Sequence, residues 1–94
     1  MNSIKPLFAF FDKARNDMRI SSTHIGIFAA LLQYRQERGF PNPINAYSHD
    51  IMPLAKISAI KTYCRCLKDL SNYGYIKYEP SKKKNKPSTI HFPE

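Results

Sequence analysis

Two cysteines separated by one residue, Cys64 and Cys66, form the spacing in this 94-residue chain that most suggests chemistry. Nearby cysteines can hold a metal ion or form a redox disulfide. On a helix, however, residues two apart point to nearly opposite sides, so this pair cannot close a disulfide or hold a metal without distant partners. We therefore expect Cys66 to be a small buried residue and Cys64 to lie nearer a charged face.

The other reactive residue types form no catalytic pattern. The three histidines, His24, His49 and His91, are scattered, and none lies at a metal-ligand spacing from another. No Ser-His-Asp arrangement, paired carboxylates or glycine-rich phosphate loop is visible, and the three glycines are isolated. The sequence therefore predicts a protein that is not an enzyme and that has no metal site and no cofactor.

Basic residues gather in one third of the chain. The formal net charge is +8, and segment 56–86 alone carries nine basic and two acidic residues. Such a surplus attracts a polyanion, and nucleic acid is the commonest one in a cytoplasm. A solvated basic face and a membrane surface are the alternatives, but the segment has no amphipathic helix of the membrane-surface kind. We expect double-stranded DNA as the partner, and no membrane.

The length and the apolar pattern predict one domain, residues 1–94. The longest apolar run, 25–32, is far too short to cross a membrane. The N-terminus lacks a basic start followed by an apolar run and a cleavage site, so it does not resemble a secretory signal. With only two cysteines, these features predict a protein of the reducing cytoplasm.

The apolar periodicity predicts helices first and a small β-hairpin last. Apolar residues at spacings of three and four predict helices over 3–17, 21–38, 48–57 and 59–72. Alternating residues predict strands at 44–47, 75–79 and 89–92, with a lysine loop between the last two. The expected fold class is therefore α+β, mainly α.

Helix ends are predicted from short polar side chains, which accept hydrogen bonds from the first free N–H groups. Ser21 or Ser22 caps the second helix, and Ser58 caps the fourth. The third helix begins at Ser48 or at Asp50, because Pro53 would remove a backbone bond from the longer version.

The first helix, 3–17, presents one apolar face built from Ile4, Leu7, Phe8, Phe11 and Ala14. Phe10 lies off this stripe and offers a second apolar face. We therefore expect this helix to be a possible dimerisation element, and the protein a possible homodimer.

The run "LAKISAIKTYCRCLKDLSNYGYIKYEP", residues 54–80, resembles the helix-turn-helix and wing of winged-helix DNA-binding domains. Such domains occur in bacterial regulators of the MarR and GntR types and in the N-terminal modules of phage and plasmid replication initiators. The likeness is greatest to small bacterial winged-helix proteins associated with mobile elements. Their "ALFQYW", "NPI" and "TYxxCLxxLxxxGYIxYxPS" correspond here to "ALLQYR" (30–35), "NPI" (42–44) and "TYCRCLKDLSNYGYIKYEPS" (62–81).

The resemblance implies a winged helix-turn-helix fold, with three or four core helices and a β-hairpin wing. It places the helix-turn-helix at 48–72 and the wing at 75–92. The 59–72 helix would enter the major groove, and the 80–87 loop would lie on the phosphate backbone. Arg65 is the expected base reader, because a guanidinium pairs bidentately with guanine. The expected DNA-binding residues are Ser58, Ala59, Ile60, Lys61, Thr62, Arg65, Lys68, Lys82, Lys83, Lys84 and Lys86.

The expected function is thus non-catalytic binding of duplex DNA by a transcriptional regulator. Two alternatives remain open at this point. The domain is a replication-initiation or excision accessory factor of a mobile element, or it is a winged-helix protein–protein interaction module, since a fold does not by itself determine a function.

Overall fold

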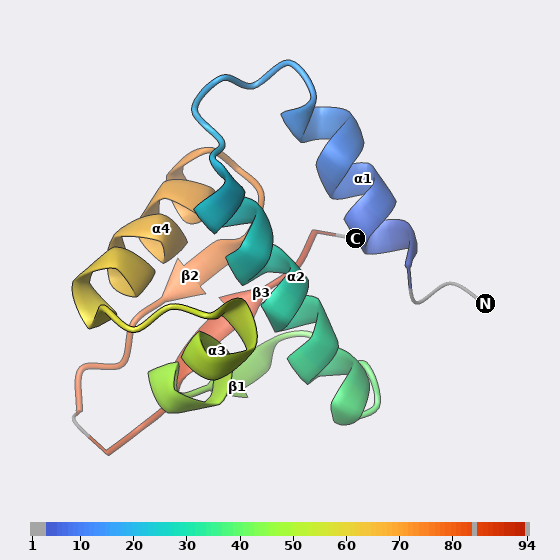
Figure 1. Ribbon diagram of the computed structural model, residues 1–94. Coiled ribbons are helices and arrows are strands. Elements are labelled where there is room, and N and C mark those ends of the chain that lie inside the picture. Colours follow the sequence, from blue (N-terminus) through green and yellow to red (C-terminus); the bar gives the residue numbers. More distant parts are fainter. Residues whose placement is uncertain (1–3, 84, 94) are drawn as a thin grey trace.

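The chain alternates helices with short strands in the predicted order, and its fold is α+β and mainly helical (Figure 1). The computed structural model describes residues 4–83 and 85–93. Within these residues the elements are α1 (Lys5–Ala14), α2 (Ser22–Glu37), β1 (Ile44–Ala46), α3 (Ser48–Ala55), α4 (Ile60–Asn72), β2 (Lys77–Glu79) and β3 (Ser88–His91).

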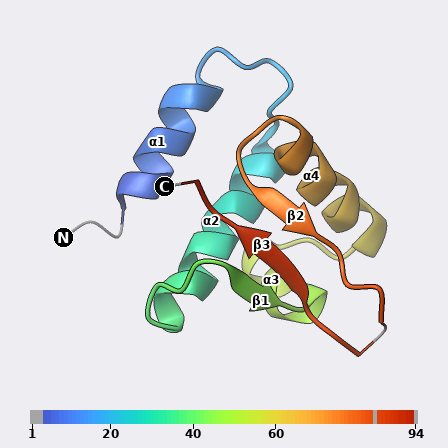
Figure 2. The ribbon, with the colours of Figure 1, turned by 180° about the vertical axis from the view of Figure 1, so that it is seen from behind.

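The three strands form one antiparallel sheet in the order β1-β3-β2 (Figure 2). β2 and β3 are the hairpin that the sequence predicts, and β1 adds to the other edge of β3 from a distant part of the chain. Ile90 of the central strand lies opposite both Ile44 and Tyr78, and its side chain is fully buried. The sheet therefore anchors the lysine loop between β2 and β3 to the body of the protein.

The first predicted hairpin strand starts later than expected. Tyr75 and Ile76 are both buried, so the alternation predicted from residue 75 does not hold there. The N–H of Tyr75 instead donates to the carbonyl of Leu70 and completes the end of α4. Only after this turn does the chain extend into β2.

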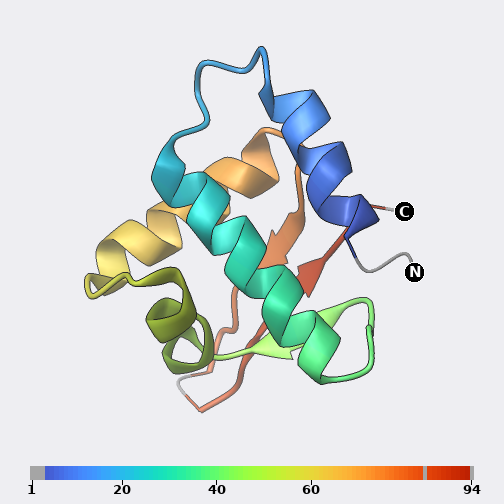
Figure 3. The same cartoon turned by 45° about the vertical axis from the view of Figure 1, so that its right-hand side comes forward.

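Helix α2 crosses the middle of the molecule, with α1 on one side and α4 on the other (Figure 3). The predicted buried stripe of α4 is confirmed, because all four of its members are nearly inaccessible: Tyr63, Cys66, Leu67 and Leu70. Fully burying a leucine side chain such as that of Leu67 or Leu70 contributes about 1.5–3 kcal/mol. This buried stripe fixes which face of α4 is turned outward.

The prediction for the faces of α1 is wrong. Phe10 is 3% exposed; its ring stacks on Phe28 at 4.2 Å between centroids and lies 5.0 Å from Tyr75. The predicted stripe is divided instead: Phe8 is 57% and Phe11 42% exposed, whereas Leu7 and Ala14 are partly buried against the core. The physical reason is that α2 and the end of α4 offer an aromatic pocket that a single ring fills.

The predicted cap of α4 is wrong, whereas one of the two predicted starts of α3, Ser48, is confirmed. Ala59 occupies the N-cap position of α4 without a side-chain bond, so Ser58 is not its cap. Tyr47 is the N-cap of α3, and Asp50 accepts its N–H at 3.1 Å from inside the first turn. Helix α3 begins at Ser48 and includes Pro53.

Ser21 is the N-cap of α2, which confirms one of the two predicted caps. Its hydroxyl accepts the N–H of His24, and the ring of His24 accepts the backbone N–H of Ser21 in return. The helix ends before Gly39, whose φ of 83° is the predicted left-handed stop.

Candidate functional site

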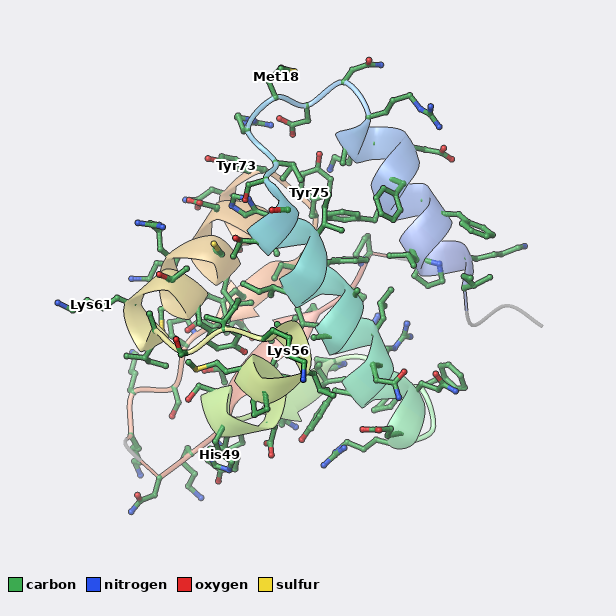
Figure 4. The ribbon with its side chains drawn as sticks, viewed as in Figure 1. Met18, His49, Lys56, Lys61, Tyr73 and Tyr75 are labelled. Atoms are coloured by element: carbon green, nitrogen blue, oxygen red, sulfur yellow. The ribbon has the colours of Figure 1, made fainter. Side chains whose placement is uncertain are left out.

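The outward face of α4 carries a row of cations. Lys61, Arg65 and Lys68 are four and three residues apart, which places them on one side of the helix, and all three are exposed. Figure 4 shows Lys61 projecting from α4 away from the body of the protein. This row lies opposite the buried stripe, so the packing of the core determines its direction.

The other predicted positions at the start of α4 are only partly available. Ser58, Ala59 and Ile60 are exposed, and Ile60 keeps 49% of its surface accessible although it is apolar. Thr62 is half-buried. The structure thus brings the first turn of α4 to the surface and turns Thr62 partly inward.

The loop between β2 and β3 places further lysines at the surface. Lys82, Lys83 and Lys86 are exposed, while the predicted Lys84 lies outside the described residues. Ser81 holds the loop, since its hydroxyl donates to the carbonyl of Lys83 at 2.8 Å and accepts the N–H of the same residue at 3.1 Å.

A cleft of about 550 Å³ separates α4 from this loop. Ile60 and Cys64 line its α4 side, and Tyr78 contributes from β2. Its opposite side is formed by the loop lysines Lys82, Lys83 and Lys86. The cleft therefore has an apolar wall facing a cationic one.

The acids near this surface have other partners. Glu79 of β2 accepts from His91 at 2.9 Å, and this bond lowers the pKa of the carboxyl. Asp69 of α4 bonds to His24 at 3.0 Å. Across residues 4–83 and 85–93, no carboxylate forms an ion pair with the cations of α4 and the loop, which are Lys61, Arg65, Lys68, Lys82, Lys83 and Lys86.

The two cysteines lie in different environments, as their spacing predicts. Cys66 is 3% exposed, and burial raises the pKa of its thiol. Cys64 is half-buried and lines the cleft. Both are free thiols.

Three potential metal ligands meet where α2 contacts α4, a grouping that the sequence did not reveal. Ligand atoms of His24, Cys66 and Asp69 lie within 4.8 Å of one another. The Nδ1 atom of His24 accepts the backbone N–H of Ser21 at 2.9 Å, so a neutral ring carries its proton on Nε2 and donates it to Asp69. Neither ring nitrogen then has a lone pair left for a metal.

The same hydrogen bonds produce a chain from the Ser21 hydroxyl through His24 to Asp69, with distances of 2.8 and 3.0 Å. A catalytic histidine must take the proton of the hydroxyl. Here the backbone N–H of Ser21 already occupies the accepting nitrogen, and the ring is 6% exposed. The group is therefore a helix cap tied to α4.

Two aromatic residues beside the loop were missed in the sequence. The rings of Tyr47 and His49 stack at 5.0 Å, and the Tyr47 hydroxyl donates to the carbonyl of Asn85. His49 projects from α3 (Figure 4) and is exposed. Only the fold brings these residues next to the lysine loop, since the bond to Asn85 spans 38 positions.

Comparison with known proteins did not place this chain in a family. Neither a scan against protein-family models nor searches of curated proteins and of solved structures gave a match. Among the described residues, no helix is long and apolar enough to cross a membrane. The features that bear on function are therefore those of the surface: the cationic face of α4, the cationic loop between β2 and β3, and the cleft between them.

Proposed function

We propose that this protein is a winged-helix domain that binds double-stranded DNA without catalysis. One observation carries the proposal: α4, whose outward face holds the cation row, and the loop between β2 and β3 lie on the same side of the molecule (Figures 1 and 2). The cleft lies between them, and Lys82, Lys83 and Lys86 line its loop side. A recognition helix followed by a basic hairpin matches two contacts that DNA offers, the major groove and the neighbouring backbone. The pairing of β1 with the hairpin is consistent with such a fold.

The dimensions of α4 suit this role. A helix of 13 residues is about 20 Å long, and the major groove is about 12 Å wide and admits one helix. Arg65 lies in the middle of the cation row, where its guanidinium would read a guanine. Lys61 and Lys68 lie one turn or less to either side and would contact phosphates.

The cleft would then receive one backbone strand as it passes from the major groove to the loop. Deoxyribose would contact the apolar side at Ile60 and Cys64. The phosphates of the same strand would face Lys82, Lys83 and Lys86 on the opposite side. This arrangement explains why an apolar wall and a cationic wall face each other.

We infer that the biological role is transcriptional regulation. A replication-initiation or excision accessory factor would use the same surface for a different process. A protein-interaction module is the alternative of another class, and the exposed aromatic residues of α1 are the observation that favours it. One small module buries limited DNA surface, so we expect two copies to act together.

The test is binding to random duplex DNA at several salt concentrations. Each phosphate contact contributes about −0.9 to the slope of log K against log salt concentration. Replacing both Lys82 and Lys83 with Gln should therefore weaken binding at low salt and make the slope shallower by roughly 2. On a DNA site selected from random sequences for tight binding, Arg65→Ala should reduce the binding free energy by about 1–3 kcal/mol. The variant should also discriminate less between bases at that position.

Arg15→Gln with Arg38→Gln is the matched control, because it removes the same charge from the ends of α1 and α2. This control should keep the wild-type slope. Equal salt slopes for the two double variants would mean that DNA binding depends on the overall charge of the protein and not on phosphate contacts at Lys82 and Lys83. If wild type bound no duplex DNA at low salt, the proposal would be ruled out. In that event, binding of an acidic protein by wild type would favour the interaction module.

A further inference from the structure

Helix α1 exposes a continuous apolar stripe. Ile4 is 49%, Phe8 57% and Phe11 42% exposed, and the helical period of 3.6 residues places all three on one side. Patches of large apolar side chains on a small protein mark interaction sites more often than single exposed residues do. The stripe has no use in the proposed DNA contact, since α1 and α4 lie on opposite sides of α2 (Figures 1 and 3).

The rest of α1 is firmly attached, so the stripe is a fixed surface. Phe10 is buried against Phe28 and Tyr75 on the inner face. The ammonium group of Lys13 donates to the carbonyl of Gly74 at 2.8 Å and lies over the ring of Tyr75. These contacts hold the helix from the inside and leave its outer face uncovered.

Charges beside the stripe select its partner. Lys5 and Asp12 lie seven residues apart, which is close to two full turns, so both flank the same edge of the stripe at opposite ends. If a second copy lies antiparallel, Lys5 of each copy faces Asp12 of the other, whose only ion pair among the described residues is a long, exposed one with Arg15 at 3.9 Å. In a parallel two-fold pair, these edges of the two copies would lie on opposite sides of the contact, so neither charge would meet its opposite. The geometry points to a two-fold dimer in which two α1 helices pack antiparallel.

The opposite edge of the stripe agrees with this arrangement. A hollow of about 250 Å³ lies there between α1 and α2; its lining is apolar at Ile4, Leu7, Ala29 and Leu32 and polar at Gln33 and Gln36. The two-fold operation that pairs Lys5 with Asp12 brings Phe11 of the second copy to this hollow. A benzene ring needs a volume of about 150 Å³, so the hollow has room for the ring of Phe11 against its apolar side.

The size of the surface predicts a weak dimer. A Phe side chain offers about 150–250 Å², so the three exposed side chains amount to roughly 300 Å² per copy. Two copies bury roughly 600 Å² through the stripe, whereas stable interfaces bury about 1,200 Å² or more. The hollow and the charged edge enlarge the contact, and we expect reversible association at roughly micromolar concentrations.

Sedimentation equilibrium of the full chain over a range of concentrations tests the inference. Phe8→Asp should raise the dimer dissociation constant at least tenfold, because Phe8 of one copy meets Phe8 of the other. Leu54→Asp is the matched control; this side chain on α3 is 43% exposed and should not affect association. Circular dichroism checks that each variant is folded.

A charge exchange tests the antiparallel geometry. Lys5→Glu and Asp12→Lys should each weaken the dimer, and the double variant should restore it, because each pair again joins opposite charges. A wild-type chain that stays monomeric at roughly 1 mM, or a double variant weaker than either single one, would overturn the inference. If the stripe binds a different protein and not a second copy, the wild-type chain would stay monomeric.

The failure of this inference is separable from that of the proposed function. Phe8→Asp should bind a short duplex with the wild-type salt slope, because one copy suffices there. The Lys82→Gln, Lys83→Gln variant should dimerise like wild type.

Discussion

At the scale of single residues, Cys64 and Cys66 show how much a helix can separate two neighbours. Cys66 belongs to the buried stripe, whereas Cys64 opens onto the cleft that we assign to DNA. The orientation of α4 follows from its apolar spacing, so the sequence was sufficient to predict it. The thiols consequently report on the direction of the helix face that carries Arg65.

A thiol-specific reagent should modify Cys64 before Cys66. The thiolate is the reacting form, and burial both covers Cys66 and raises the pKa of its thiol. Modification of Cys66 should therefore stay slow even at about pH 9, where an exposed thiol is largely ionised. Mass spectrometry of the labelled peptides distinguishes the two sites.

Duplex DNA should slow the reaction of Cys64, because the bound backbone would cover the cleft. The Cys64→Ser variant is the control and should react only at the slow rate of Cys66. Equal rates for the two thiols in the wild type would contradict the orientation of α4, and a rate at Cys64 that DNA leaves unchanged would contradict its place in the interface.

The hydrogen bonds of His24 were not predictable, although its chemistry is simple. Its partners are Ser21, three residues away, and Asp69, 45 residues away. Local spacing can suggest a cap, but a contact across 45 residues depends on how α2 crosses α4. Side chains whose partners are distant in sequence therefore required the structure.

At the scale of elements, the helix-ending glycines were predictable and the faces of α1 were not. After α2 and α4 the chain turns back through a left-handed residue, and glycine supplies this conformation at the lowest cost. The face of α1 depends on Phe28 and Tyr75, which lie elsewhere in the chain. An aromatic residue on each side of a helix leaves its periodicity ambiguous.

Gly74→Ala should destabilise the protein more than Gly39→Ala. Both positions have positive φ, 86° and 83°, so alanine costs about 1–2 kcal/mol at each. At Gly39 the added methyl group meets nothing within 4 Å, whereas at Gly74 it comes within 3.1 Å of the Lys13 ammonium nitrogen. Displacing Lys13 weakens the bond that ties α1 to the end of α4 and adds about 0.5–1.5 kcal/mol.

Urea unfolding followed by circular dichroism measures the two losses. Lys13→Ala with Gly74→Ala is the third variant needed, because it removes the steric contact and the bond together. The extra cost at residue 74 should disappear in this background. Equal losses for the two glycine variants would show that the Lys13 contact contributes nothing to stability.

At the scale of the whole molecule, the cations of α4 and the loop lie on one side, where their mutual repulsion lowers the free energy of unfolding. The chain carries +8, and the cations of α4 and the loop have no ion-pair partners among the described acids. Like charges held close together repel each other in the folded state. The excess of cations in 56–86 was visible in the sequence, but the position of the loop lysines Lys82, Lys83 and Lys86 across a cleft from α4 required the folded hairpin.

Raising the NaCl concentration from about 20 mM to about 200 mM should therefore stabilise the wild-type protein, because salt screens this repulsion. We expect the thermal midpoint to rise by about 2–4 °C, which corresponds to roughly 0.5 kcal/mol for a domain of this size. Replacing both Lys82 and Lys83 with Gln should raise the midpoint at low salt and reduce its further rise with salt, since part of the repulsion is already gone.

The Arg15→Gln, Arg38→Gln control should respond to salt like wild type, because Arg15 pairs with Asp12 and Arg38 lies over the ring of Tyr34. Thermal melts followed by circular dichroism make the comparison, and a wild-type midpoint that falls with salt would show that the basic face is not under repulsion.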